Sequence, residues 1–141
     1  MPLASHIVNL SSAFDNSQRL LHVNIPYRDT INQVINFSKT FRNCHNLLSV
    51  SGLNRPWANI HAMSSMFLNC ENMVSCDLIL PDSMTFYHGY RNIWNGCKSL
   101  INDINNMLPT IGFTNKDVDM DCTFKNCQSL TGNVPSGLLW E

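Results

Sequence analysis

The chain repeats one short motif at nearly constant intervals. In each copy an aromatic residue is followed by Asn or Gly at the second position after it, by Cys at the third and by Leu or Met at the sixth. The four clear copies are TFRNCHNL (40–47), MFLNCENM (66–73), IWNGCKSL (93–100) and TFKNCQSL (123–130). A weaker copy, AFDNSQRL (13–20), carries Ser17 in place of Cys. Repeats at a period of roughly 20–50 residues indicate a fold of stacked, equivalent units.

Apolar residues upstream of the Cys predict a short helix in each copy. Counted from the aromatic residue, apolar residues recur at offsets −7, −4, 0 and +3, which trace one face of a helix. The exceptions are Asp117 at −7 of the last copy and Ser17 at +3 of the first. In one copy they are Ile60, Met63, Phe67 and Cys70. Asn or Gly at +2 suits the left-handed residue that follows a helix. We therefore expect each helix to end at Asn16, Asn43, Asn69, Gly96 or Asn126.

Downstream of each turn the pattern changes to that of a strand. Apolar residues lie at +6, +9 and +11, as in Leu20, Val23 and Ile25, and alternation of this kind is typical of a half-buried strand. The sequence thus predicts an α/β fold, a leucine-rich-repeat solenoid of about five helix-turn-strand units. A parallel sheet would form one face and short helices the other. The expected single domain, 1–141, has units near 4–28, 29–54, 55–81, 82–110 and 111–141.

Composition argues against several classes of function. The chain has 141 residues, a net charge of −1 and only 13% charged residues, so it has no electrostatic basis for binding nucleic acid or an anionic membrane. No apolar run approaches the ~20 residues of a membrane-spanning helix. The first residues do not resemble a secretion signal. This favours a cytoplasmic or particle-associated location, unless the chain is a fragment of a surface protein.

The segment MSSMFLNCENMVSCDLILP (63–81) resembles a known family. It is similar to the roughly 26-residue leucine-rich repeat of BspA-like bacterial surface proteins. The matching residues are Met63, Met66, Phe67, Cys70 and Met73. The resemblance implies a scaffold used in adhesion and protein binding.

The cysteines are expected to serve as packing material. Cys44, Cys70, Cys97 and Cys127 occupy the same position in their copies and should form a column, as should the repeated aromatic residues. Cys76 and Cys122 lie off the thiol column. Disulfides need an oxidising compartment and Cα pairs within ~7 Å, and zinc sites need more closely spaced ligands. We expect buried, reduced thiols, with disulfides as the main alternative and a metal site as the lesser one. No cofactor is expected.

The sequence offers little support for catalysis. Cys44 and His45 are adjacent, but a Cys–His catalytic pair meets in space and is rarely adjacent in sequence. In the predicted unit Cys44 faces inward and His45 outward. No set of acid, base and nucleophile converges elsewhere, so the chain is expected not to be an enzyme.

The acidic segment KDVDMD (116–121) resembles the start of a calcium loop. An EF-hand loop from Asp117 would need Gly at position 122 and Glu at 128, where the chain has Cys122 and Gln128. The favoured interpretation is a helix start, with Thr114 and Asp117 as a capping box. No metal site is predicted.

The outward positions of the strands form the predicted binding surface. Small polar side chains occupy them, and the strand face is where repeat proteins commonly bind partners. The alternative is a merely solvated face. The residues are His22, Asn24, Ser49, Ser51, Ser75, Asp77 and Asn102.

These features predict a non-enzymatic protein-interaction or adhesion module, with an unidentified protein or glycan partner. The alternative is a structural subunit of a larger assembly, such as a phage virion or tail. Low charge, many Asn residues and an end without a legible polar cap after Pro135 suit that alternative. Leu138, Leu139 and Trp140 would either fold back over that end or dock on another chain.

Overall fold

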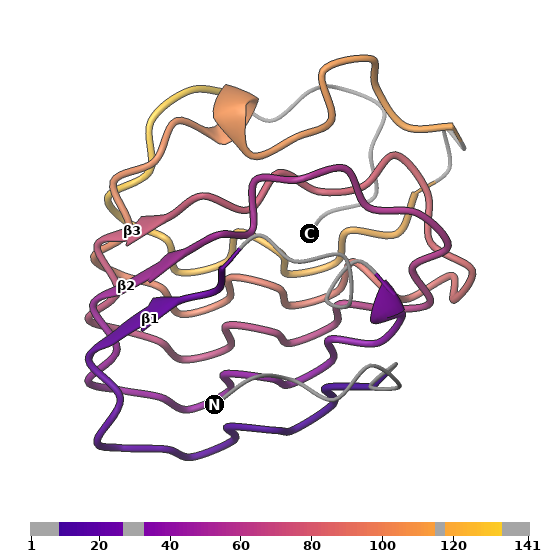
Figure 1. The fold of residues 1–141 in the computed structure, drawn as a ribbon. Helices are drawn as coiled ribbons and strands as arrows, with labels where there is room; N and C mark the ends of the chain where they lie inside the picture. The colour runs from indigo at the N-terminus through magenta and orange to yellow at the C-terminus, as the bar shows by residue number, and fades with distance from the viewer. Residues whose placement is uncertain (1–8, 27–32, 115–117, 134–141) are drawn as a thin grey trace.

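The chain winds into coils that stack on one another (Figure 1). This computed structural model describes residues 9–26, 33–114 and 118–133. Three strands, β1 (His22–Asn24), β2 (Ser49–Ser51) and β3 (Ser75–Cys76), form one parallel sheet in that order. A 3-10 helix, η2 (Ile104–Asn106), follows in a later coil. The register places Val23 opposite Val50, and Val50 opposite Cys76, so equivalent positions of successive copies are neighbours.

The predicted α/β leucine-rich-repeat fold of helix-turn-strand units is wrong. No α-helix occurs in residues 9–26, 33–114 or 118–133. Where helices were expected, the chain forms overlapping β-turns. In the copy around Phe67, hydrogen bonds from Met66 N to Met63 O (3.1 Å) and from Cys70 N to Phe67 O (3.0 Å) close two of these turns.

Left-handed residues explain why turns replace the helix. Asn69 has a φ of 62° and Ser65, at offset −2, has a φ of 57°. Each is the third residue of its turn, where a type II turn requires positive φ. A right-handed helix requires negative φ throughout, so two such residues within five positions exclude it.

Both left-handed positions recur in every copy. The prediction that the +2 residue is left-handed is confirmed at Asn16, Asn43, Asn69, Gly96 and Asn126. At −2 the residue types are unrelated, so the sequence gives no sign of their positive φ. These residues are Ser12, Lys39, Ser65, Asn92 and Cys122.

Backbone hydrogen bonds between coils hold the stack together. The amides of Ser65, Phe67 and Asn69 donate to the carbonyls of the next coil, at 2.9, 2.8 and 2.8 Å. Their acceptors are Arg91, Ile93 and Asn95. In each copy that has a following coil, the amides at −2, 0 and +2 donate to carbonyls at −3, −1 and +1 of that coil. The amides that a helix would use along its own axis therefore bond across the stack.

The repeated aromatic residues form a continuous column, as predicted. Consecutive rings lie 5.6, 5.5, 6.4 and 5.6 Å apart between centroids, with interplanar angles of at most 9°. The three central rings are at most 1% exposed. Parallel, closely stacked rings add to the stability that comes from burial alone. This aromatic column consists of Phe14, Phe41, Phe67, Trp94 and Phe124.

The repeated cysteines form a second column, also as predicted. All six cysteines are free thiols. The Sγ atoms of Cys44, Cys70, Cys97 and Cys127 each donate a hydrogen bond to the carbonyl of the aromatic residue in the preceding coil, at 3.0–3.2 Å. Burial raises the pKa of all four thiols, that of Cys127 to about 11. The thiols therefore stay protonated at neutral pH and act as small apolar donors.

Candidate functional site

Most of the predicted polar face lies on the three strands, with Asp77 just after β3, whereas Asn102 lies in a coil without a described strand. Its side chains bond to one another across coils. His22 Nδ1 and Ser49 Oγ are hydrogen-bonded at 2.7 Å, and Ser51 Oγ donates to Asn24 Oδ1 at 3.2 Å. Ser75 is exposed on β3. These side chains form a largely exposed polar surface whose groups are aligned by the sheet.

Two residues of the predicted face have a structural task. The carboxylate of Asp77 accepts hydrogen bonds from the amides of Gly52 and Leu53, both at 2.9 Å. The side chain of Asn102 donates to Cys76 O at 2.7 Å. Asp77 and Asn102 hold neighbouring coils together, so they are weaker candidates for contact with a partner than the residues of β1 and β2.

An exposed aliphatic row borders this polar face. Leu21 is 52% exposed, Leu48 36%, Val74 41% and Ile101 62%. All four occupy offset +7 of their copies. Successive members are joined by backbone hydrogen bonds, from Leu48 N to Leu21 O (2.7 Å), Val74 N to Leu48 O (2.8 Å) and Ile101 N to Val74 O (3.2 Å). The row is therefore a continuous apolar strip across four coils.

Our sequence interpretation missed this aliphatic row, although the sequence contains a sign of it. Each member directly follows an apolar residue at +6 that is buried or, at Leu20, partly buried, as in Leu47–Leu48 and Leu100–Ile101. In an extended segment, successive side chains point in opposite directions. A pair of adjacent apolar residues repeated in four copies thus indicates one buried and one exposed position.

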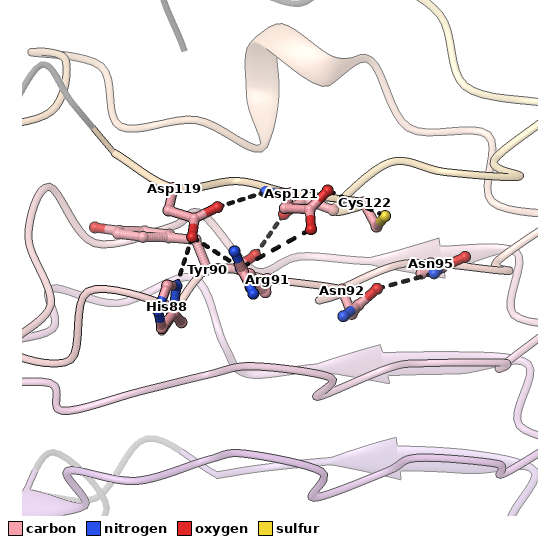
Figure 2. Close-up of polar contacts among 9 residues, drawn as sticks. His88, Tyr90, Arg91, Asn92, Asn95, Asp119, Asp121 and Cys122 are labelled. Atoms are coloured by element: carbon pink, nitrogen blue, oxygen red, sulfur yellow. Dashed lines mark hydrogen bonds and ion pairs between the residues drawn. The ribbon is translucent and has the colours of Figure 1, made fainter. Parts of the chain in front are cut away.

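A network around Asp119 joins two coils (Figure 2). Asp119 is 3% exposed and accepts hydrogen bonds from His88 Nδ1 (2.5 Å), Arg91 Nε (2.8 Å) and the Asp121 amide (3.1 Å). Burial alone would raise the pKa of this carboxyl, but the hydrogen bonds from His88, the Asp121 amide and Arg91 hold it below its usual value. Both oxygens of the buried carboxylate thus accept hydrogen bonds.

The polar groups around this network are bonded to one another or to the backbone. His88 is oriented by Asp119, but the nearby Tyr90 hydroxyl is buried and donates to Pro81 O at 2.7 Å. Cys44 is likewise buried in the thiol column, away from any pairing with its neighbour His45. In the described ranges, no three His, Cys, Asp or Glu side chains are placed to hold a metal ion.

The acidic segment 116–121 takes no helical form where it is described. Asp119 and Asp121 lie in bridge and turn structure, and Asp119 bonds to His88 and Arg91. Asp117, the second half of the predicted capping box, lies outside the described residues. Thr114 instead donates from Oγ1 to Asp82 Oδ2 at 2.9 Å.

Exposed rings gather beside the Asp119 network. Phe86 is 42% and Tyr87 49% exposed. His61 lies 5.6 Å from Phe86 between ring centroids, and Tyr87 lies 4.9 Å from His88. A cavity of about 170 Å³ is lined by both rings and by residues from Asp82 to Thr85, with Tyr90 and Val118. This is a second surface on which a partner could be anchored by aromatic contacts.

Comparisons of the chain with protein-family models, with curated proteins and with solved structures find no match. The resemblance to BspA-like repeats and the expected unit boundaries therefore remain predictions. The described part of the chain contains no helix with the length and apolar character needed to cross a bilayer. Pro135 and the apolar residues 138–140, on which the predicted end contact depended, lie outside the described residues.

Proposed function

We propose that the chain is a non-enzymatic protein-interaction or adhesion module, and that its partner contacts the aliphatic row together with the polar residues of β1 and β2. The single observation that supports this is the row itself. Four aliphatic side chains on adjacent coils are 36–62% exposed. Contiguous exposed apolar surface of this kind commonly marks a binding site for another protein.

The energetics of the row suit a binding role. Full burial of an exposed aliphatic side chain stabilises by roughly 1.5–3 kcal/mol, so the row members, which are already partly covered, would each contribute about half of that. The hydrogen-bonded pairs His22–Ser49 and Asn24–Ser51 lie beside the row on neighbouring positions. They supply donors and acceptors of fixed direction, which favour one partner over others.

A photo-crosslinking experiment tests this proposal. A photoreactive residue at Leu48, in the row, should crosslink to a partner in the source cells. The same residue at Ile111, which is 87% exposed and outside the row, is the matched control and should not.

The crosslinked partner is then purified for binding measurements. Val74→Asp combined with Ile101→Asp should weaken its binding at least tenfold, while Ile111→Asp leaves the affinity unchanged. Val74→Ser with Ile101→Ser provides a milder pair if the charged pair disturbs the fold. Unchanged affinity in folded row variants would contradict the proposal.

A structural role within a larger assembly is the second candidate. The observation that favours it is Phe14 in the first coil, which is 43% exposed although its equivalents in the aromatic column are buried. A stack that leaves such a ring half uncovered has an end suited to further stacking.

A further inference from the structure

Among residues 9–26, 33–114 and 118–133, the first and last coils carry backbone groups of opposite kind that lack a partner. Inside the stack, amides at −2, 0 and +2 bond to carbonyls of the next coil. In the first copy, the carbonyls of Ser11, Ala13 and Asp15 accept no bond of this kind from the described residues. In the last copy, the amides of Phe124 and Asn126 donate none within the described residues. One end therefore offers acceptors and the other offers donors at the matching offsets.

Charged side chains at offset +1 are complementary in the same way. Asp15 of the first copy is bound by Arg42 of the second, through Nε at 3.0 Å and Nη2 at 2.5 Å. The last copy has Lys125 at this offset, and it is exposed. If the coil that carries Asp15 followed the coil that carries Lys125, the carboxylate would lie between two cations.

The side chain at offset +5 also bonds to the preceding coil, and the first copy has a donor at this position without a preceding described coil. Asn46 and Ser129 each donate from their side chains to the carbonyl at +4 of the preceding coil, both at 2.8 Å. Arg19 holds this position in the first copy and is exposed. Placed after the last coil, Arg19 could donate to the carbonyl of Gln128, which is the +4 residue there.

Apolar surface accompanies these polar groups at the first coil. A cavity of about 210 Å³ opens there, lined by Leu10, Phe14, Val23 and Phe37 among others. Phe14 is 43% exposed, whereas Phe124 at the other end is 8% exposed. The acceptor end is thus the more open of the two, and stacking of Phe14 on Phe124 requires the outer face of Phe124 to be uncovered on docking.

We propose that the first coil of one copy docks head-to-tail on the last coil of a second copy. The Phe124 amide of that second copy would then donate to Ala13 O of the first copy, and its Asn126 amide would donate to Asp15 O. Lys125 would pair with the Asp15 carboxylate. Such a contact is heterologous and leaves one free end on each side, so it generates open chains of molecules. The row members Val74 and Ile101 lie outside the two coils that meet in this contact, so the contact can be tested independently of them.

A charge-exchange experiment with the full chain tests the contact. Wild type should show a molar mass that rises with concentration in size-exclusion chromatography with light scattering. Lys125→Glu places Glu against Asp15, and Asp15→Lys places Lys against Lys125, so each variant alone should require at least tenfold more protein to associate. An equimolar mixture of the two variants should associate again. In a chain in which the variants alternate, each contact brings an acidic side chain at one of the positions 15 and 125 against a basic side chain at the other.

Two controls separate loss of the contact from loss of the fold. Phe14→Lys should abolish association, whereas Ile111→Lys should leave it unchanged. Circular dichroism must show folded protein for each variant, and Asp15→Asn replaces Asp15→Lys in the single-variant comparison if the latter unfolds.

A wild-type chain that stays monomeric up to its solubility limit would overturn the proposal. The proposal would also be overturned if the Lys125→Glu variant associated as readily as wild type, or if the equimolar mixture of the two variants failed to associate. Val74→Asp with Ile101→Asp should leave self-association intact, which keeps this result distinct from the outcome for the binding module.

Discussion

At the scale of single residues, backbone conformation is the main constraint on this chain. Each copy needs a left-handed residue at −2 and at +2. Asn and Gly reduce the cost of that conformation at +2, but Lys39 and Cys122 adopt it at −2 without such help. The cost is roughly 1–2 kcal/mol for an ordinary residue. Hydrogen bonds between coils must offset it.

Gly52 gives a test of this constraint, because Gly112 is a matched control. Both have positive φ, 92° at Gly52 and 82° at Gly112. A Cβ added to Gly52 would lie 1.9 Å from Ile25 O, whereas a Cβ added to Gly112 would have no neighbouring atom within 4 Å. Gly112→Ala should cost about 1 kcal/mol of unfolding free energy, from conformation alone. Gly52→Ala should cost roughly 2–4 kcal/mol, since the neighbouring coil must also move. Urea unfolding measures both; equal losses would contradict the close approach.

At the scale of elements, the sequence correctly predicted which residues of successive copies lie next to one another, but it predicted the wrong secondary structure for the segments before each cysteine. The aromatic and thiol columns, and the left-handed +2 position, follow from repeat spacing alone because stacked copies bring equal offsets together. The helices were wrong because offsets −7, −4, 0 and +3 fit both a helix and a series of turns. Only the φ of residues such as Ser65 and Lys39 separates these, and their residue types do not reveal it. The aliphatic row was missed because position +7 was not considered separately from +6.

The contact between the last two coils can be tested at Asp119. Asp119→Asn should lower the unfolding free energy by about 1.5–3 kcal/mol at neutral pH, because a buried acceptor of charge-assisted hydrogen bonds is lost. Asp121→Asn is the matched control: its carboxylate is 42% exposed and 4.0 Å from Arg91, so its effect should be within about 0.5 kcal/mol.

The same pair of variants gives a pH dependence with a defined sign. The pKa of Asp119 is lowered in the folded chain from an ordinary value of 3.8. The contribution of Asp119 to the free energy of unfolding is therefore fully present above pH 3.8 and is lost as the pH falls through the pKa of the folded chain. The difference between wild type and Asp119→Asn should narrow below about pH 4. A difference that stays constant with pH would show that Asp119 does not carry this stabilisation.

At the scale of the whole molecule, the chain behaves as a one-dimensional stack in which each coil contacts its neighbours. The central coils are covered on both sides, and the central aromatic rings are at most 1% exposed. Within the described residues the first coil has a neighbouring coil on one side only, and Phe14 is 43% exposed. Stability should therefore fall from the centre of the stack toward its first coil.

Amide hydrogen exchange measures this gradient. The amides of Phe14 and Phe67 both donate to the next coil, at 2.9 and 2.8 Å, so they differ mainly in position. Phe67 should exchange the more slowly, because it opens only with the central coils. Phe124 and Asn126 should exchange faster than Phe67, since their amides have no acceptor in the described part of the chain. Equal protection of Phe14 and Phe67 would show instead that the molecule opens only as a whole.

The unequal spacing of the copies has an evolutionary consequence. Three intervals between aromatic residues are 26 or 27 residues long, and the fourth is 30. The longer interval contains η2 and the segment with Ile111, which is 87% exposed, yet the ladder from Trp94 to Thr123 and from Gly96 to Lys125 keeps its offsets. Length changes are thus absorbed in peripheral loops. A lineage could duplicate or delete whole copies, and enlarge the loops between them, without disturbing the stacked rings.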